Sequence, residues 1–190
     1  MADPPRPHGT RLVAGPDAER RRPINRAPLP ALAAGMPWGS IMALSLVTFS
    51  PVIAAAPVMP PLAFMTFLAW RMLRPGFLPV WAGLPLGLWD DLFSGQPFGS
   101  AVVLWSATML AMEVIDERFL WRGFAQDWLA AAALTSGYLL LGAGLASLAA
   151  HHWLVWTIAP QWLMAVVLFP VINRMVALLD RVRLRPLGRA

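Results

Sequence analysis

The sequence contains no cysteine and no lysine, and only 13% of its 190 residues are charged. Without cysteine the chain has no disulfide, no thiolate and no cysteine-bound metal. Without lysine, all fifteen basic residues are arginine. The scarcity of charge accompanies a hydrophobic content of 58% and a mean hydropathy of +0.59. This composition indicates a membrane protein, and the length suits one compact domain.

The arginines give the chain a pI near 11.4, which alone would suit a nucleic-acid-binding protein. Along the sequence, however, they bracket apolar segments and form no single basic face. We therefore expect no nucleic-acid partner.

Residues 1–35 differ from the rest of the chain. They hold seven prolines and six arginines, and little that could form a core. We predict a disordered, Arg/Pro-rich cytoplasmic tail over 1–35. This segment is too long and too proline-rich to be the charged start of a cleavable signal peptide. The first apolar segment is therefore expected to remain as a membrane helix.

Six apolar segments follow the tail, at about 36–56, 61–73, 77–94, 98–116, 127–150 and 153–179. A membrane crossing takes about 20 residues of helix, so the second segment is short and the third is marginal. A helical hairpin that dips into the membrane is the alternative for these two. We predict an all-α, polytopic membrane helical bundle of about six transmembrane helices over 36–180, followed by a basic cytoplasmic tail over 181–190.

The arginine distribution supports six crossings. With a cytoplasmic N-terminus, all fifteen arginines fall in the tail, the turn after the second segment, the loop after the fourth, or the C-terminal end. Arginine bias in short loops orients membrane helices, so both termini are expected in the cytoplasm. We expect Arg71 and Arg174 to snorkel to headgroups. The C-terminal arginines are expected to meet anionic lipid, and they are Arg181, Arg183, Arg185 and Arg189.

Two further sets of residues have simple interpretations. Six tryptophans lie near segment ends, where tryptophan anchors helices at the membrane interface, and they are Trp38, Trp70, Trp81, Trp121, Trp153 and Trp156. His151 and His152 are adjacent in an expected outside turn, and no third ligand is close in the sequence. We therefore predict interfacial anchors and no metal site.

Two adjacent acids, Asp90 and Asp91, lie near the end of the third apolar segment. A carboxylate at the centre of a membrane helix costs about 2.5 to 3.5 kcal/mol, so its presence requires an explanation. In the structural interpretation, Asp91 caps backbone N–H groups at the start of the fourth segment, near Gly99 and Ser100. The alternative is a direct role in binding a ligand, a proton or a partner. Adjacent helical residues point about 100° apart, so we expect one acid to face the bundle and the other its rim.

One of the two acids, Asp91, belongs to a longer pattern of glycine and proline. The spacing Gly-x-x-x-Asp-x-x-x-Gly-x-Pro-x-Gly, met by Gly87, Asp91, Gly95, Pro97 and Gly99, resembles the signature of the MreD family. Members of this family are rod shape-determining integral membrane proteins of bacteria.

The short second segment, which ends at Arg71 and Arg74, is similar to the arginine turn of that family. The resemblance covers about residues 36–185. Asp90 lies outside the minimal motif, and the long N-terminal tail departs from the compact family pattern. Nothing is carried over from the family to either.

The resemblance implies a non-enzymatic scaffold of the cell-elongation complex, which makes lateral peptidoglycan at the bacterial inner membrane. The implied partners are an MreC-like membrane protein, MreB, and RodA with its transpeptidase. The implied fold is similar to that of the substrate-binding subunits of energy-coupling vitamin transporters. No catalytic residue, cofactor or metal is implied, and no small-molecule substrate is expected.

Two alternatives belong to other classes. A small-molecule permease or transporter substrate-binding subunit would need a polar cavity, and the apolar segments offer few polar residues to line one. An intramembrane enzyme would need a second acid near Asp91, and no other apolar segment supplies a comparable one.

Overall fold

The computed structural model describes residues 30–48, 59–118, 123–150 and 158–184. These residues form six α-helices and one short 3-10 helix, with no strand among them. The α-helices are α1 (Pro30–Thr48), α2 (Leu62–Leu73), α3 (Gly83–Asp91), α4 (Ser100–Arg118), α5 (Phe124–Ala150) and α6 (Ala159–Arg183), and the 3-10 helix is η1 (Val80–Ala82). The predicted all-α class is confirmed.

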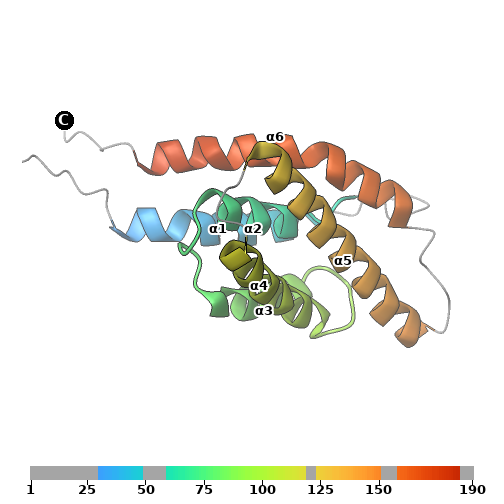
Figure 1. The fold of residues 1–190 in the computed structure, drawn as a ribbon. Helices are drawn as coiled ribbons and strands as arrows, with labels where there is room; N and C mark the ends of the chain where they lie inside the picture. The colour runs from blue at the N-terminus through green and yellow to red at the C-terminus, as the bar shows by residue number, and fades with distance from the viewer. Residues whose placement is uncertain (1–29, 49–58, 119–122, 151–157, 185–190) are drawn as a thin grey trace, which may run out of the picture.

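The helices pack around α2. In Figure 1, α6 runs along the top with α1 beneath it, α5 crosses obliquely, and α3 and α4 lie below. α2 contacts α1, α5 and α6, while α3 packs chiefly on α4. The central helix is therefore α2, which has only 12 residues.

The composition of α2 explains its place. Leu62–Leu73 has no glycine or proline and is apolar on every side apart from Thr66 and Arg71, and a helix that is apolar all round belongs in a core. Ten of its twelve residues are buried. Pro75 follows the helix, and Gly76 adopts a φ of +80°, so the chain turns away there.

Aromatic side chains fill the space around α2. Phe64 stacks on Tyr138 of α5 at 4.2 Å between ring centroids, and Phe67 contacts Trp105 of α4 at 4.9 Å. Trp70 is fully buried and donates a hydrogen bond from Nε1 to Ser40 Oγ at 2.9 Å. The interfacial position predicted for Trp70 is wrong, because its side chain points into the core, although α2 ends at the exposed residues 74–76.

Helix boundaries differ from the predicted segments by two or three residues at α4 and α5, and by more in three other places. α1 begins at Pro30, so residues 30–35 of the predicted tail are helical, and proline suits the first helical position. α6 continues to Arg183, so the first three residues of the predicted basic tail are also helical. The third segment is shorter than 77–94, because Pro79 is extended and helical structure starts at Val80. The remaining tail residues, 1–29 and 185–190, the pair His151–His152, and Trp121, Trp153 and Trp156 lie outside the described residues.

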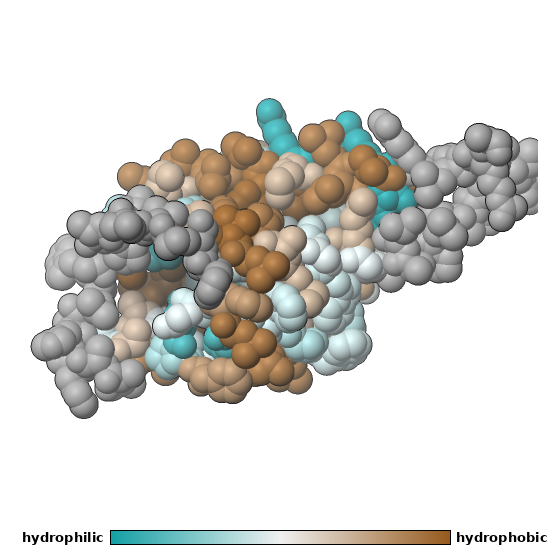
Figure 2. Space-filling view, turned by 180° about the vertical axis from the view of Figure 1, so that it is seen from behind, coloured by the Kyte–Doolittle hydropathy of each residue, from teal (hydrophilic) through white to brown (hydrophobic). Residues whose placement is uncertain are grey.

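The outer faces of the helices are strongly apolar. In α6, six exposed apolar residues recur every three or four positions, and they are Leu163, Val167, Val171, Met175, Leu178 and Val182. Figure 2 shows apolar residues over much of one face of the molecule, with strongly hydrophilic ones in a few places.

Two helices are long and apolar enough to cross a membrane, α5 over Phe124–Ser147 and α6 over Ala159–Arg183. Only 33% and 22% of their most apolar stretches are buried, so both turn most of their apolar surface outward. Gly35–Val47 and Leu62–Leu73 are apolar but shorter.

Candidate functional site

α3 and α4 approach each other through glycines on one face of α3. A Cβ atom at Gly87 would lie 2.7 Å from the carbonyl oxygen of Ala101, and one at Gly83 would lie 2.9 Å from the backbone of Ser106. Glycines four residues apart share a helix face and allow two backbones to meet. Gly87 therefore serves the packing of α3 on α4. Gly83 was missed as its partner, although the four-residue spacing was available in the sequence.

Asp91, the last residue of α3, caps the start of α4. Its Oδ2 accepts hydrogen bonds from the backbone N–H groups of Gly99 at 3.0 Å and Val102 at 3.2 Å. Its Oδ1 accepts from the N–H of Ala101 at 2.9 Å and from the Ser100 hydroxyl at 3.4 Å. The predicted capping role of Asp91 is confirmed.

With this cap, every backbone N–H group from Gly99 to Val103 has an acceptor. The remaining donor, the N–H of Ser100, bonds to the carbonyl of Pro97 at 3.0 Å, and the N–H of Val103 bonds to that of Gly99 at 3.1 Å. A helix N-terminus carries partial positive charge as well as unpaired donors, so a buried carboxylate is stabilised there. Helix caps are usually side chains of the residue at the helix start. Here the cap of α4 is Asp91, a residue of the preceding helix.

The turn between the two helices explains the other motif positions. Gly95 and Gly99 adopt φ values of +66° and +92°, in the left-handed region that side chains with a Cβ disfavour. Pro97 lies between them with its own φ fixed by its ring, and its carbonyl accepts the Ser100 hydrogen bond. Two motif residues on α3 and three in the turn after it therefore fix together where α4 begins relative to α3.

Asp90 is buried as deeply as Asp91, and each is 6% exposed. The expectation that one acid faces the rim is wrong, because α3 is covered by α1 on one side and by α4 on another. The buried Ser45 of α1, whose hydroxyl donates to the carbonyl of Ile41 at 3.4 Å, lies near the Asp90 side chain. Asp90 thus belongs to the α1–α3 contact, whereas Asp91 belongs to the α3–α4 contact.

Arg71, at the end of α2, forms a buried ion pair. It is 4% exposed, and its Nη1 lies 2.8 Å from Oδ2 of Asp116 in α4. Glu113, one helical turn earlier, is 3.8 Å away. The prediction that Arg71 snorkels outward is wrong, because α2 places the guanidinium under the last turns of α4. The i, i+3 spacing of the two acids was the sequence signal for this site.

Arg74 takes part in a second charge cluster. Its Nε and Nη2 donate to Oδ2 of Asp180 in α6 at 3.1 and 2.8 Å. Oδ1 of Asp180 is paired with Arg183 at 2.8 Å, and the guanidinium of Arg183 lies 4.3 Å above the centre of the Phe77 ring. The Arg183 side chain is only 5% exposed, so the expectation that it meets lipid is wrong.

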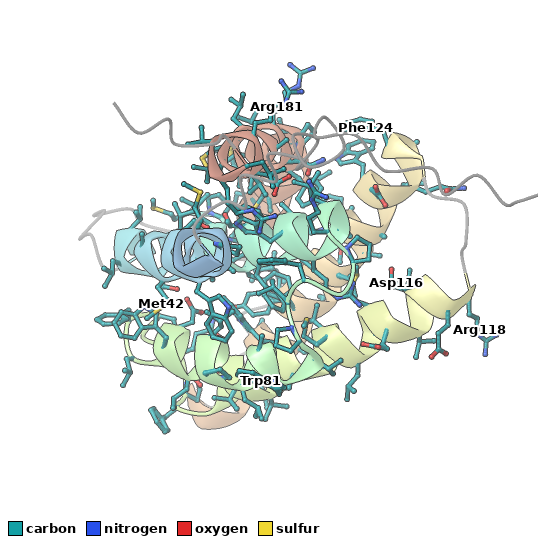
Figure 3. The ribbon with its side chains drawn as sticks, turned by 90° about the vertical axis from the view of Figure 1, so that its left-hand side faces the viewer. Met42, Trp81, Asp116, Arg118, Phe124 and Arg181 are labelled. Carbon is teal, nitrogen blue, oxygen red and sulfur yellow. The ribbon has the colours of Figure 1, made fainter. Side chains whose placement is uncertain are left out.

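The residues predicted as one family pattern therefore form two separate sites. The glycine–aspartate turn lies at the start of α4, whereas Arg71 contacts Asp116, about 24 Å further along that helix at 1.5 Å per residue. In Figure 3, which views the end of the bundle where α6 finishes, Arg118 and Arg181 point away from the helices. The arginine contacts tie α2 to α4 and α6, and the turn ties α3 to α4.

Compared with known proteins, the chain matches no family model, no curated protein and no solved structure.

Proposed function

We propose that this chain is a multi-pass protein of the bacterial inner membrane and a non-enzymatic scaffold of the cell-elongation complex, as its resemblance to MreD suggests. The observation that carries the proposal is the turn from Gly87 to Gly99. Each residue of the resembling motif has a distinct structural task there, as a close-packed glycine, a cap, a proline or a glycine of positive φ. Because all five motif residues serve packing or the turn, the motif supports a scaffold role, in which the protein keeps α3 and α4 in one fixed arrangement.

The exposed apolar rows support the membrane placement. Soluble monomers rarely expose contiguous apolar patches larger than a few hundred Å², and here the long helices α5 and α6 carry apolar residues outward along most of their length. Apart from Arg174, which lies nine residues before the end of α6, the arginines of the described helices lie in the last turns of α2, α4 and α6 or just beyond α2. This distribution fits six crossings with both termini in the cytoplasm.

The use of Asp91 supports a scaffold over an enzyme or a permease. Both of its oxygens accept hydrogen bonds from the start of α4, and those bonds fix the carboxylate in one position. A catalytic or transport acid must exchange partners during its cycle, and Asp91 would release α4 if it did so. In the proposed role, the bundle presents a fixed surface to an MreC-like membrane protein, and through it to MreB, RodA and the transpeptidase.

The test is depletion of the protein in its native host, followed by microscopy of cell shape. Rounding and widening before growth stops is the expected result, and re-expression of the wild type should restore rods. An Arg118→Gln variant, changed at an exposed arginine away from the turn, should restore them equally. Cells that remain rod-shaped throughout depletion would contradict the proposal and favour the permease alternative.

A further inference from the structure

The arginines of α6 divide into two sets with different surroundings. Arg183 faces the bundle, where it is paired with Asp180 and stacked over Phe77. Arg174 and Arg181 are exposed and lie seven residues apart, which places them on one face of the helix about 10 Å from each other. Figure 3 shows Arg181 pointing outward from α6. Only this second set is available to something outside the bundle.

The charge on that outer face is not balanced from within α6. Asp180 is the one acid in the sequence of this helix, and it is buried between Arg74 and Arg183. Among the described residues, the ion pairs formed by arginine involve Arg71, Arg74 and Arg183, and none involves Arg174 or Arg181. Two positive charges therefore remain on the face.

The rest of the same face is apolar. Val171, Val167 and Leu163 continue it towards the start of α6, and all three are exposed. From Arg174 to Leu163 the helix rises about 16 Å, which is close to half of a hydrocarbon core of about 30 Å. The face thus presents positive charge at one end and apolar surface over the depth of one leaflet.

We propose that this face of α6 binds an anionic phospholipid, with its phosphate at Arg174 and Arg181 and its acyl chains along Val171, Val167 and Leu163. The two arginines match the negative phosphate of such a lipid, and the apolar part of the face matches the length of its acyl chains. The inference rests on the membrane placement in the proposed function and is independent of the role in cell elongation.

The experiment measures lipid selectivity of the full chain in phosphatidylcholine vesicles, with spin-labelled phosphatidylglycerol and spin-labelled phosphatidylcholine as probes. The wild type should prefer the phosphatidylglycerol probe. Arg174→Gln and Arg181→Gln should each lower this preference about fivefold, because an arginine that contacts the lipid phosphate contributes about that factor. Arg118→Gln, which removes an exposed arginine from α4, should leave the preference unchanged.

Further variants distinguish a loss of positive charge from a general disturbance of the fold. The double replacement Arg174→Lys with Arg181→Lys keeps both charges and should retain the preference. A double glutamine variant that retains wild-type selectivity would overturn the proposal. Displacement of the probe by soluble glycerol phosphate would also overturn it, because it would show a site for free phosphate. A dimer abolished by Val171→Arg would place a second copy on this face instead.

The outcome is distinguishable from failure of the proposed function. Wild-type protein that fails to float with vesicles of either composition would overturn the membrane placement and this inference together. Rod-shaped cells after depletion would overturn only the elongation role, and the lipid selectivity would stand.

Discussion

At the scale of single residues, the turn between α3 and α4 depends on Asp91. Its carboxylate supplies the acceptors for three backbone N–H groups and one hydroxyl between Gly99 and Val102. Loss of an ordinary helix cap costs about 1 kcal/mol, whereas each buried donor left without an acceptor costs about 1 to 3 kcal/mol. Removal of this side chain should therefore cost more than removal of an ordinary cap.

We expect Asp91→Ala to lower the stability of the purified protein by about 3 kcal/mol, since several buried donors lose their acceptor together. Asp91→Asn retains one acceptor oxygen, so its loss should be intermediate. The midpoint of thermal unfolding in neutral detergent measures both. Glu117→Gln, at an exposed acid in the last turn of α4, serves as the control and should leave the midpoint unchanged. Equal midpoints for the alanine variant and the wild type would contradict the capping role.

A second prediction at the residue scale concerns Gly87, where α3 packs closely on α4. Gly87→Ala should destabilise the protein, because the added Cβ would meet the backbone of Ala101 at 2.7 Å and force α3 away from α4. Gly144→Ala in α5 is the matched control. No atom lies within 4 Å of a Cβ built there, and alanine favours helix by about 1 kcal/mol over glycine. Thermal unfolding of the two variants should give shifts of opposite sign, and a shift of the same sign would exclude close packing as the reason for glycine.

At the scale of helices, the unusual element is α2, which is short, central and ends in a buried charge. Arg71 and Asp116 tie this helix to α4, but the two partners differ in exposure. Arg71 is 4% exposed, whereas the side chain of Asp116 is 22% exposed. Removal of either partner therefore leaves the other in a different environment.

We expect Asp116→Asn to cost about 3 kcal/mol, because the buried Arg71 loses its nearer acid and keeps only the more distant and more exposed Glu113. Arg71→Met should cost less, since the acids left behind are nearer the surface. Combining Arg71→Met with Asp116→Leu should recover most of the loss, because an apolar pair can replace a buried ion pair. A double-mutant cycle on unfolding free energies measures the coupling, and additive losses would show that the pair does not act as a unit.

At the scale of the whole molecule, the proposed membrane placement predicts an orientation from the exposed apolar rows and the arginine positions. The chain has no cysteine, so a single introduced cysteine reports the side on which it lies. Phe98→Cys places the probe at an exposed position of the α3–α4 turn, and Arg118→Cys places it at the exposed end of α4.

In spheroplasts, an impermeant maleimide should label Phe98→Cys, whereas Arg118→Cys should react only after the membrane is opened. The reason is that 19 residues of α4 separate the two ends and arginine-rich ends remain in the cytoplasm. The cysteine-free wild type provides the background. Labelling of both variants in intact spheroplasts would contradict the six-crossing arrangement.

The sequence allowed prediction of features that depend on residues close in the chain. The extent of α2, the turn at Gly95–Gly99 and the cap by Asp91 all follow from local patterns of apolar residues, glycine, proline and an acid. The partner of Arg71 could not be predicted in this way. Asp116 lies 45 residues away, and the contact depends on how α2 packs under α4. Burial of Asp90 and Arg183 likewise depends on the neighbouring helices α1 and α2.

The cap described for Asp91 also has a consequence for how such a chain is made. The backbone N–H groups that donate hydrogen bonds to its carboxylate belong to residues eight to eleven positions later. At a synthesis rate of about 5 to 20 residues per second, the acid leaves the ribosome about one second before its last partner does. In the proposed membrane placement, the nine residues of α3 would during that interval bring two acids to the membrane before the helix that Asp91 caps has been made. If the proposed six crossings hold, we expect α3 and α4 to enter the bilayer together, as a hairpin, and not one after the other.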